Sequence, residues 1–419
     1  MNTQTDLKKM AIAAKTATFE MLKASLERKN GALKALIENL KKYQKNILQA
    51  NRQDVSLAKA NGLNASLLER LSLENRLEGI IHDITHVLAL PDPVGALFDE
   101  QSLPNRLKIA KCRTPIGVLG IIYESRPNVT LDISALTIKS GNCVILRGGS
   151  ETPHTNKILV EIIQQSLAAI GLPTAAVQLI ANSDRAEVKK LLQLYEYIDL
   201  IISRGSAALQ QFCREHSTIP VVTGGVGICH LFVDETADLD RSLMVILNAK
   251  TQRPTVCNAL DTLLVHAAIA PLFIPKIVQT LSREAVTFCL DRKAWELVQN
   301  PACKLAESND WDTEWLSLVL GIKVVENMEE AIQHVRIHST GHSDGILTES
   351  HQHAEFFTRE VDSAAVYVNA STRFTDGGQF GLGSEVAIST QKLHARGPMG
   401  LQELTSYKWI IRGNYQVRT

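Results

Sequence analysis

The stretch GVLGIIYESRPNVTLDISALTIKSGNCVILRGG, which runs from Gly117 to Gly149, decides the fold of this 419-residue chain. It opens with an apolar run, continues through a segment of helical composition that stops at Gly141, and ends in a second apolar run, CVILRG. Strands that are buried on both faces have such near-continuous apolar runs. The stretch therefore predicts a β-α-β unit of a parallel sheet that is covered by helices on both faces.

The same alternation extends toward the C-terminus. The segment PHTNKILVEIIQQSLAAIG predicts a helix with Pro153 just inside its start and Gly171 just past its end, because helix termini favour these two residues at these places. Further strands are predicted at AVQLIA, IDLIISRG, IPVVTGG and CHLFVD. From about residue 239 to residue 391 the alternation is repeated, which predicts a second α/β lobe.

Two other segments flank the alternation. From residue 5 to about residue 90 the pattern is helical, with breaks expected at Asn30-Gly31 and Asn61-Gly62. After it, NRLKIAKC predicts a hairpin-like strand, and near the end of the chain YKWIIRG predicts an isolated strand that needs a partner. Pairing with LKIAKC, in the same chain or in a neighbouring subunit, would satisfy its backbone groups.

The composition limits the classes of function. The 44 basic and 44 acidic residues cancel, so no overall charge attracts nucleic acid or an anionic membrane. Seven cysteines without a C-x-x-C pair indicate free thiols in a reducing cytosol. No apolar run reaches membrane-spanning length. We therefore expect a cytoplasmic protein with neither a nucleic-acid nor a membrane partner.

One cysteine has unusual surroundings. Cys257 lies in NAKTQRPTVCNALDTLLV, after a polar Gln-Arg-Pro turn and before an apolar run, whereas Cys143 and Cys213 lie in apolar elements. A buried cysteine is usually an inert apolar residue. The position of Cys257 at the border of loop and core leaves two alternatives open, a packing residue and a nucleophile.

The histidines and glycines are less specific. His334 and His338 are one helical turn apart, but no nearby glutamate completes a zinc motif, and we assign no metal. The glycine clusters RGGSE, RGS and TGGVG are ordinary tight turns taken singly, and none is the G-x-G-x-x-G fingerprint of dinucleotide-binding folds.

Taken together and in order, three stretches of the chain resemble the aldehyde dehydrogenase superfamily: PIGVLGIIYESRPNVTLDISALTIKSGNCVILRGG, NAKTQRPTVCNALDTLLV and STRFTDGGQFGLGSEVAISTQKLHARGPMGLQELTSYKWIIRG. The resemblance implies an aldehyde dehydrogenase-like α/β fold with two lobes and a small β-hairpin flap. It assigns residues 1–103 and 116–226 to a cofactor-binding domain and residues 227–399 to a catalytic domain. Residues 104–115 and 400–419 would then form an oligomerisation hairpin and strand.

Within this superfamily the chain most resembles the branch that reduces L-glutamate 5-phosphate to glutamate 5-semialdehyde. That reaction uses NADPH, releases phosphate and is the second step of proline biosynthesis. The resemblance implies a homo-oligomer, and glutamate 5-kinase, which makes the unstable substrate, is a possible partner.

The resemblance also implies roles for individual residues. The superfamily nucleophile aligns with Cys257, which would form a thioester with the substrate. An asparagine that stabilises the oxyanion falls near Asn128, for which capping of the following helix is the alternative. Substrate anions would be bound by four arginines, Arg126, Arg253, Arg373 and Arg396, for each of which structural ion pairing is the alternative.

Glu314 aligns with the glutamate that holds the nicotinamide ribose, although a solvated glutamate at a helix start is the alternative. Arg147 and Ser150 would face the 2′-phosphate, because relatives that use NAD have an acidic residue where this chain has Ser150, while Glu151 argues the other way. The other expected cofactor residues are Arg204, Gly205, Gly224 and Gly225. SRGSAAL departs from the paired glycines that are more usual after the arginine.

Two competing functions have different requirements. A hydrolytic aldehyde dehydrogenase needs a carboxylate in an E-x-G-G stretch, whereas this chain has VTGG from Val222 to Gly225. A scaffold protein that keeps only the fold would not need Cys257, Arg147 and Glu314.

Overall fold

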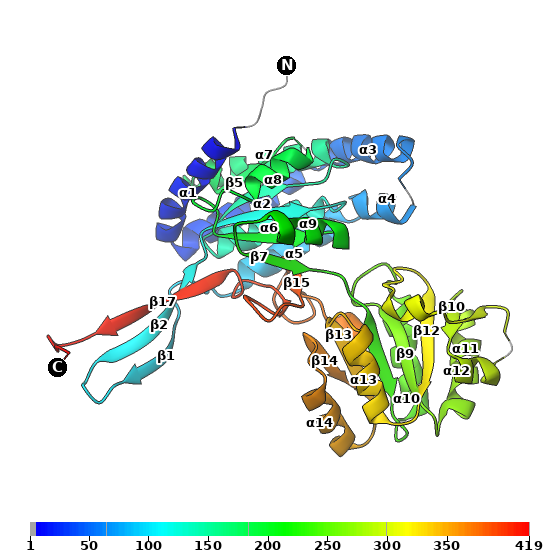
Figure 1. The fold of residues 1–419 in the computed structure, drawn as a ribbon. Helices are drawn as coiled ribbons and strands as arrows, with labels where there is room; N and C mark the ends of the chain where they lie inside the picture. The colour runs from blue at the N-terminus through cyan, green and yellow to red at the C-terminus, as the bar shows by residue number, and fades with distance from the viewer. Residues whose placement is uncertain (1–5, 64, 183, 299, 419) are drawn as a thin grey trace. The chain divides into compact units, whose positions relative to one another are not determined.

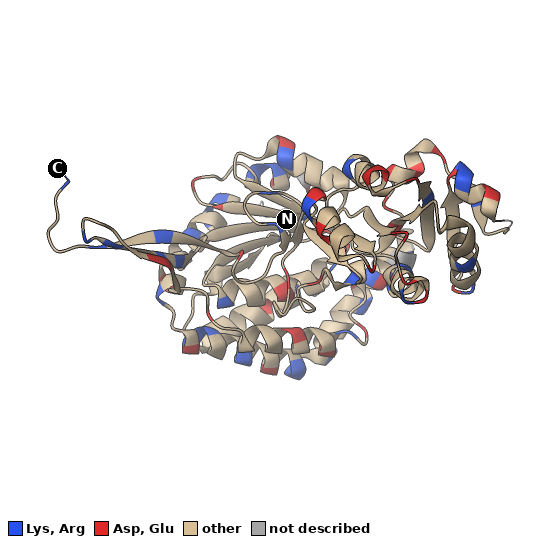
Figure 2. Cartoon of the chain, turned by 90° about the horizontal axis from the view of Figure 1, so that it is seen from below, with Lys and Arg blue, Asp and Glu red and all other residues tan. Residues whose placement is uncertain are grey.

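The computed structural model describes residues 6–63, 65–182, 184–298 and 300–418 (Figure 1). The chain divides into two compact units. Unit 1 consists of Met1–Gly224, Gly381–Ala387 and Leu393–Thr419, and unit 2 of Gly225–Phe380 and Ile388–Lys392. Basic and acidic residues are interspersed over both units (Figure 2). No helix in the described part of the chain is long and apolar enough to cross a membrane.

Unit 1 contains the parallel sheet that the stretch from Gly117 to Gly149 predicts. Its parallel strands are β3 (Val118–Tyr123), β4 (Cys143–Arg147), β5 (Val177–Leu179), β6 (Leu200–Arg204) and β7 (Val221–Gly224). They are hydrogen-bonded in the order β7-β6-β3-β4-β5. Every residue of β3 and β4 is buried, which explains why both strands are apolar without alternation.

Helices surround this sheet, and the first five form the helical N-terminal segment. They are α1 (Leu7–Lys23), α2 (Leu26–Lys42), α3 (Gln44–Ala60), α4 (Ala65–Leu71) and α5 (Leu77–Ala89), followed by α6 (Asn128–Lys139), α7 (Pro153–Ala169), η1 (Thr174–Ala176), α8 (Arg185–Leu191) and α9 (Ala207–His216). The expected break at Asn61-Gly62 is confirmed as the end of α3. The break expected at Asn30-Gly31 is wrong, because both residues lie inside α2, and Ser25 caps that helix instead.

Unit 2 is a second α/β unit, as the repeated alternation predicts. Its strands are β8 (Cys229–Val233), β9 (Leu260–His266), β10 (Thr287–Leu290), β11 (Cys303–Leu305), β12 (Val319–Val325), β13 (Ser343–Leu347) and β14 (Ala365–Val368). They form a sheet in the order β11-β10-β12-β9-β8-β13-β14, and the neighbouring strands are parallel.

Each face of the unit 2 sheet has its own apolar cluster. Leu231 and Leu263 belong to one cluster, whereas their chain neighbours Phe232 and Leu264 belong to the other, because successive side chains of a strand point to opposite faces. The helices of the unit are α10 (Leu239–Thr251), α11 (Ala270–Ser282), α12 (Arg292–Leu297), η2 (Ser308–Asp312), α13 (Met328–His338), α14 (His351–Glu360) and η3 (Thr372–Phe374).

A small antiparallel sheet completes the fold. It has the strand order β1 (Leu97–Ser102), β2 (Lys108–Pro115) and β17 (Thr405–Arg412). The C-terminal strand β17 pairs with β2 of the same chain, from Thr405 opposite Pro115 to Arg412 opposite Lys108. The partner that the isolated strand needs is therefore intramolecular. Two further short strands, β15 (Ile388–Ser389) and β16 (Gly397–Pro398), precede β17 in the chain.

Candidate active site

The candidate nucleophile lies in the loop between α10 and β9 of unit 2. Cys257 is half-buried, and its sulfur is not part of a disulfide. The loop enters β9 from its amino end, and because the strands of this sheet are parallel, the segments that precede β8, β12 and β13 reach the same edge. The segment that enters β8 contacts each of the other three: Gly227 meets Cys257 and Glu314, and the N–H of the next residue, Ile228, donates to the hydroxyl of Thr340 over 3.0 Å.

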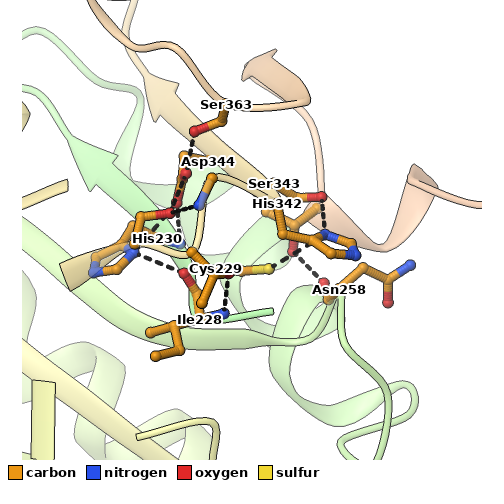
Figure 3. A network of polar contacts seen from close by, with 12 residues as sticks. Ile228, Cys229, His230, Asn258, His342, Ser343, Asp344 and Ser363 are labelled. Atoms are coloured by element: carbon orange, nitrogen blue, oxygen red, sulfur yellow. Dashed lines mark hydrogen bonds and ion pairs between the residues drawn. The ribbon is translucent and has the colours of Figure 1, made fainter. Parts of the chain in front are cut away.

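The backbone of Cys257 is held from one side by the segment that enters β8. A side chain at Gly227 would place its Cβ 1.7 Å from the carbonyl oxygen of Cys257, so only glycine fits there. The thiol of Cys229 donates a hydrogen bond to that same oxygen over 3.2 Å. Burial raises the pKa of Cys229 well above its usual value, which keeps the thiol protonated as a donor. Figure 3 shows Cys229 within a buried polar network that also includes His342 and Ser343.

The candidate cofactor residue Glu314 meets this segment as well. Its Oε1 accepts a hydrogen bond of 2.9 Å from the backbone N–H of Gly227. Gly227 therefore contacts the backbone of Cys257 and the carboxylate of Glu314. The structure brings together these two residues, which are 57 positions apart in the sequence and were linked only by resemblance.

A second loop is tied to the residue after the nucleophile. The side chain of Asn258 donates to the carbonyl oxygen of Thr375 over 2.9 Å, and the hydroxyl of Thr372 donates to the carbonyl oxygen of Asn258 over 2.7 Å. Arg373, between these two threonines, donates from Nε to Oε1 of Gln252 over 2.9 Å. The loop that contains Cys257 therefore holds Arg373 in place through these hydrogen bonds.

Arg373 shares its surroundings with two other predicted residues. Burial lowers the pKa of Arg373, the nearby Cys257 raises it, and the like charge of Arg253 lowers it again. Arg253 is exposed, whereas Arg373 is half-buried. Beside them lies a pocket of about 200 Å³ lined by Asn248, Gln252, Arg373, Phe374, Asp376 and Gln379. Unit 2 thus combines a thiol, two guanidinium groups and a polar pocket, which suits a substrate with anionic groups.

In unit 1 the predicted cofactor residues follow the strands instead of preceding them. Arg147 ends β4 and is only 7% exposed, whereas Ser150 is exposed. Oε1 of Glu151, the residue that argued against NADPH, accepts hydrogen bonds from the N–H and the hydroxyl of Ser125 over 2.6 and 2.7 Å. That carboxylate is therefore already engaged within the protein.

Arg204 and Gly205 lead from β6 into α9. Ser206 caps this helix, with its hydroxyl accepting from the N–H of Leu209 over 3.3 Å. The N–H of Ser206 donates to Oε2 of Glu124 over 2.8 Å, and a Cβ at Gly205 would lie 2.4 Å from that carboxylate oxygen. Backbone N–H groups at a helix start suit a phosphate group, and here a carboxylate oxygen accepts one of them.

The end of β7 is more open. Gly224 is the last residue of that strand. Gly225 has a φ of +107°, which favours glycine, and a Cβ there would meet nothing within 4 Å. This glycine therefore leaves free space beside the chain.

The remaining predicted residues of unit 1 are half-buried: Arg126, Asn128 and Arg396. Asn128 is the first residue of α6, and its Nδ2 donates to Oδ2 of Asp132 over 2.9 Å. The helix has Pro127 at its cap and no side-chain cap, so the alternative in which Asn128 caps the helix is wrong.

Some residues around Cys257 were not found from the sequence: Gln252, Gly227, Cys229, Lys250 and Asp261. The glycine cluster TGGVG contained one of them, but nothing in that pattern indicates that its last glycine contacts the cysteine loop. Cys229 has no signal of its own, because an apolar strand with one cysteine is unremarkable. The described residues contain no group of three or more His, Cys, Asp and Glu that could hold a metal ion.

Comparisons with known proteins show the family of the chain. The model of the aldehyde dehydrogenase family matches residues 1–293. The gamma-glutamyl phosphate reductase of Psychromonas ingrahamii is 53% identical over 414 residues, which are 99% of this chain and 100% of that protein. The corresponding protein of Pasteurella multocida is 51% identical over 418 residues, with the same coverage. The crystal structure of the gamma-glutamyl phosphate reductase of Thermotoga maritima superposes with a TM-score of 0.95 at 47% identity, covering 99% of this chain and 100% of that one. The chain therefore belongs to the gamma-glutamyl phosphate reductases of the aldehyde dehydrogenase family.

Proposed function

We propose that this chain reduces L-glutamate 5-phosphate to L-glutamate 5-semialdehyde with NADPH, releasing phosphate, as a step of proline biosynthesis. The observation that carries the proposal is the 53% sequence identity with a gamma-glutamyl phosphate reductase over 99% of this chain. The half-buried thiol of Cys257, which lies near Arg253 and Arg373, supports it. The alternative of a scaffold without activity does not account for that fixed geometry.

Cys257 is the nucleophile of the proposed reaction. Its sulfur attacks the acyl carbon, the carbon–sulfur bond forms, and the bond to the phosphate oxygen breaks as phosphate leaves. Arg253 and Arg373 bind the anionic groups of the substrate, because guanidinium groups form paired hydrogen bonds with phosphate and carboxylate. In unit 1, Arg126 and Arg396 are further candidates for the same task. In unit 2 the backbone N–H of Cys257 is the proposed oxyanion donor, and in unit 1 the resemblance makes the side-chain amide of Asn128 a candidate.

Each unit, taken by itself, has groups that suit a dinucleotide cofactor. The start of α9 supplies backbone N–H groups, Gly225 leaves open space, and Glu314 offers a carboxylate for a ribose hydroxyl. Ser150, which is exposed, is proposed to recognise the 2′-phosphate together with Arg147. NADPH held by these residues would supply a hydride to the thioester. The resulting thiohemiacetal then releases the aldehyde and restores the thiol of Cys257.

Assembly and location follow the same resemblance. The antiparallel sheet of β1, β2 and β17 exposes about half of Tyr407 and Trp409, and we assign it to contact with further copies of this chain. A cytoplasmic location and transfer of the acyl phosphate from glutamate 5-kinase complete the proposal.

The test is an NADPH oxidation assay in which glutamate 5-kinase and ATP generate the acyl phosphate in place. The wild-type chain is expected to consume NADPH and to form semialdehyde and phosphate in equal amounts. Cys257→Ser should reduce turnover by roughly 10³-fold or more, as the loss of a nucleophile does in other enzymes, while NADPH binding is retained. Turnover at the wild-type rate in this variant would refute the role of Cys257.

A further inference from the structure

Two charged side chains are buried next to the Cys257 loop without belonging to the expected substrate or cofactor residues. Lys250 is the penultimate residue of α10, and Asp261 is the second residue of β9. Their side chains are 0% and 4% exposed, and Nζ of Lys250 lies 3.7 Å from Oδ1 of Asp261. These two residues bracket the loop that contains Cys257.

The lysine connects the two ends of this loop. Its ammonium group donates a hydrogen bond of 2.8 Å to the carbonyl oxygen of Leu260, the first residue of β9. The end of α10 is thereby bonded to the start of the strand that follows the loop. Burial lowers the pKa of Lys250, while the nearby Asp261 raises it.

The aspartate connects the loop to the segment of Glu314. Its Oδ1 accepts a hydrogen bond of 3.2 Å from the backbone N–H of Trp315, the next residue after Glu314. Burial raises the pKa of Asp261 to about 7, and the charge of Lys250 together with the backbone N–H groups of Trp315 and Cys229 works against that rise. Asp261, the second residue of β9, therefore interacts with Cys229 at the start of β8 and with the segment that enters β12.

We propose that Lys250 and Asp261 are positioning residues, which hold the Cys257 loop and the Glu314 segment in the geometry required for the reduction. The proposal rests on the proposed role of Cys257 as the nucleophile. The pair acts only through backbone atoms of Leu260, Trp315 and Cys229.

The energetics of buried charges support a positioning role over one in stability. Desolvation of two buried charges offsets most of their attraction, so an apolar pair of similar volume is often equally stable. An apolar pair, however, cannot form directed hydrogen bonds to a carbonyl group and to an N–H group. The specific gain from Lys250 and Asp261 is thus the orientation of these backbone segments.

Three variants test the proposal. Asp261→Asn keeps the shape and one acceptor but removes the charge, and Lys250→Met removes the ammonium group. The double variant Lys250→Met with Asp261→Leu replaces the whole pair by apolar side chains, which keeps the test decisive where a single change unfolds the protein. The matched control is Lys139→Met in unit 1, because Lys139 is equally buried and donates to the carbonyl oxygen of Leu88 over 2.9 Å.

The measurements are urea unfolding, kcat and KM for the acyl phosphate, and the rate at which iodoacetamide alkylates Cys257, read by mass spectrometry. We expect kcat of the folded double variant to fall by about 10²-fold, since a displacement near 1 Å has that effect, with a smaller change in KM and an altered alkylation rate. Lys139→Met is expected to lose stability only.

Wild-type kcat and alkylation in the folded double variant would overturn the proposal, and so would an equal loss of both in Lys139→Met. Failure of the proposed function has a different signature, because Cys257→Ser would then retain turnover whatever the state of the buried pair.

Discussion

The two sheets of this protein present their functional candidates at opposite ends of their strands. In unit 1, Arg147 ends β4, Gly205 follows β6 and Gly224 ends β7, at the carboxyl edge of the parallel sheet. In unit 2, Cys257 and Glu314 precede β9 and β12, at the amino edge. Carboxyl edges are the usual ligand sites of α/β sheets, because helix starts and tight turns meet there. The location of the thiol is the exception.

The difference lies in what holds each edge together. At the carboxyl edge of unit 1, glycines and the N–H groups of a helix start are available to a ligand. At the amino edge of unit 2, buried side chains such as Cys229 and Asp261 hold the backbone by directed hydrogen bonds. A ligand edge tolerates adjustment when the ligand binds, whereas a nucleophile requires a fixed position.

The largest expected effect tests the amino edge of the unit 2 sheet, where hydrogen bonds hold the Cys257 loop. Gly227→Ala adds a Cβ that would lie 1.7 Å from the carbonyl oxygen of Cys257, so the loop must move. We expect kcat to fall by about 10²-fold, the usual cost of a displacement near 1 Å. Gly79→Ala is the control, because a Cβ there meets nothing within 4 Å in helix α5. Normal kcat in a folded Gly227→Ala variant would contradict the arrangement described here.

The next effect concerns Asp132 beside Asn128. Burial is the main cause that raises its pKa from 3.8 to about 7, and the hydrogen bond from Asn128 opposes the rise. Between these pH values the folded state binds a proton that the unfolded state lacks, so stability is higher at the acid end and falls as the pH rises toward 7.

Asp132→Asn should remove this fall, which we expect to amount to about 2 kcal/mol between pH 4 and pH 7 once partial solvent access is included. Urea unfolding at several pH values measures it. Asp240→Asn, at an exposed site, serves as the control. A slope that persists unchanged in Asp132→Asn would show that this carboxyl ionises normally in the folded protein.

A smaller effect is expected at the carboxyl edge of the unit 1 sheet. Ser150→Glu places a carboxylate where the 2′-phosphate is proposed to bind, and like-charge repulsion should raise KM for NADPH by about 10-fold. KM for NADH, which lacks this phosphate, should change little. Parallel assays with both cofactors decide the matter, and equal changes for the two would locate the 2′-phosphate elsewhere.

The smallest effect is expected at the amino edge of the unit 2 sheet. Cys229→Ala removes the thiol that donates to the carbonyl oxygen of Cys257. A single weak hydrogen bond is worth on the order of 0.5–1 kcal/mol, so kcat should fall about threefold. Cys143→Ala, in the buried strand β4, is the matched control. An identical kcat in Cys229→Ala and wild type would leave Gly227 as the residue that fixes this side of the loop.

Much of the fold could be predicted from the sequence, because continuous apolar strands and helix periodicity depend on local composition. The error at Asn30-Gly31 has a tertiary cause: α2 continues through both residues, and Gly31 faces Ile170 at the end of α7, where a Cβ would be in ordinary contact at 3.4 Å. Propensity alone cannot anticipate such packing.

The candidate site could be predicted from the sequence only in part. Cys257 stood out because its neighbours change from polar to apolar, but its link with Glu314 depends on Gly227, where three segments of the chain meet. The buried pair of Lys250 and Asp261 gives no pattern, because charged residues at a helix end and at a strand start normally face solvent. The pair can be recognised only from contacts between segments that are distant in the sequence.

The pairing of β2 with β17 has a consequence for synthesis of the chain. Arg113 donates a hydrogen bond to the hydroxyl of Thr405, a residue 292 positions later. At about 5–20 residues per second, the ribosome needs about 15–60 s to deliver the second partner after the first. Throughout that interval the hydrogen-bonding edge of β2 lacks its neighbour, and such an edge invites pairing with other chains. Each nascent chain on a polysome therefore passes through a period in which the edges of its neighbours compete with its own C-terminus.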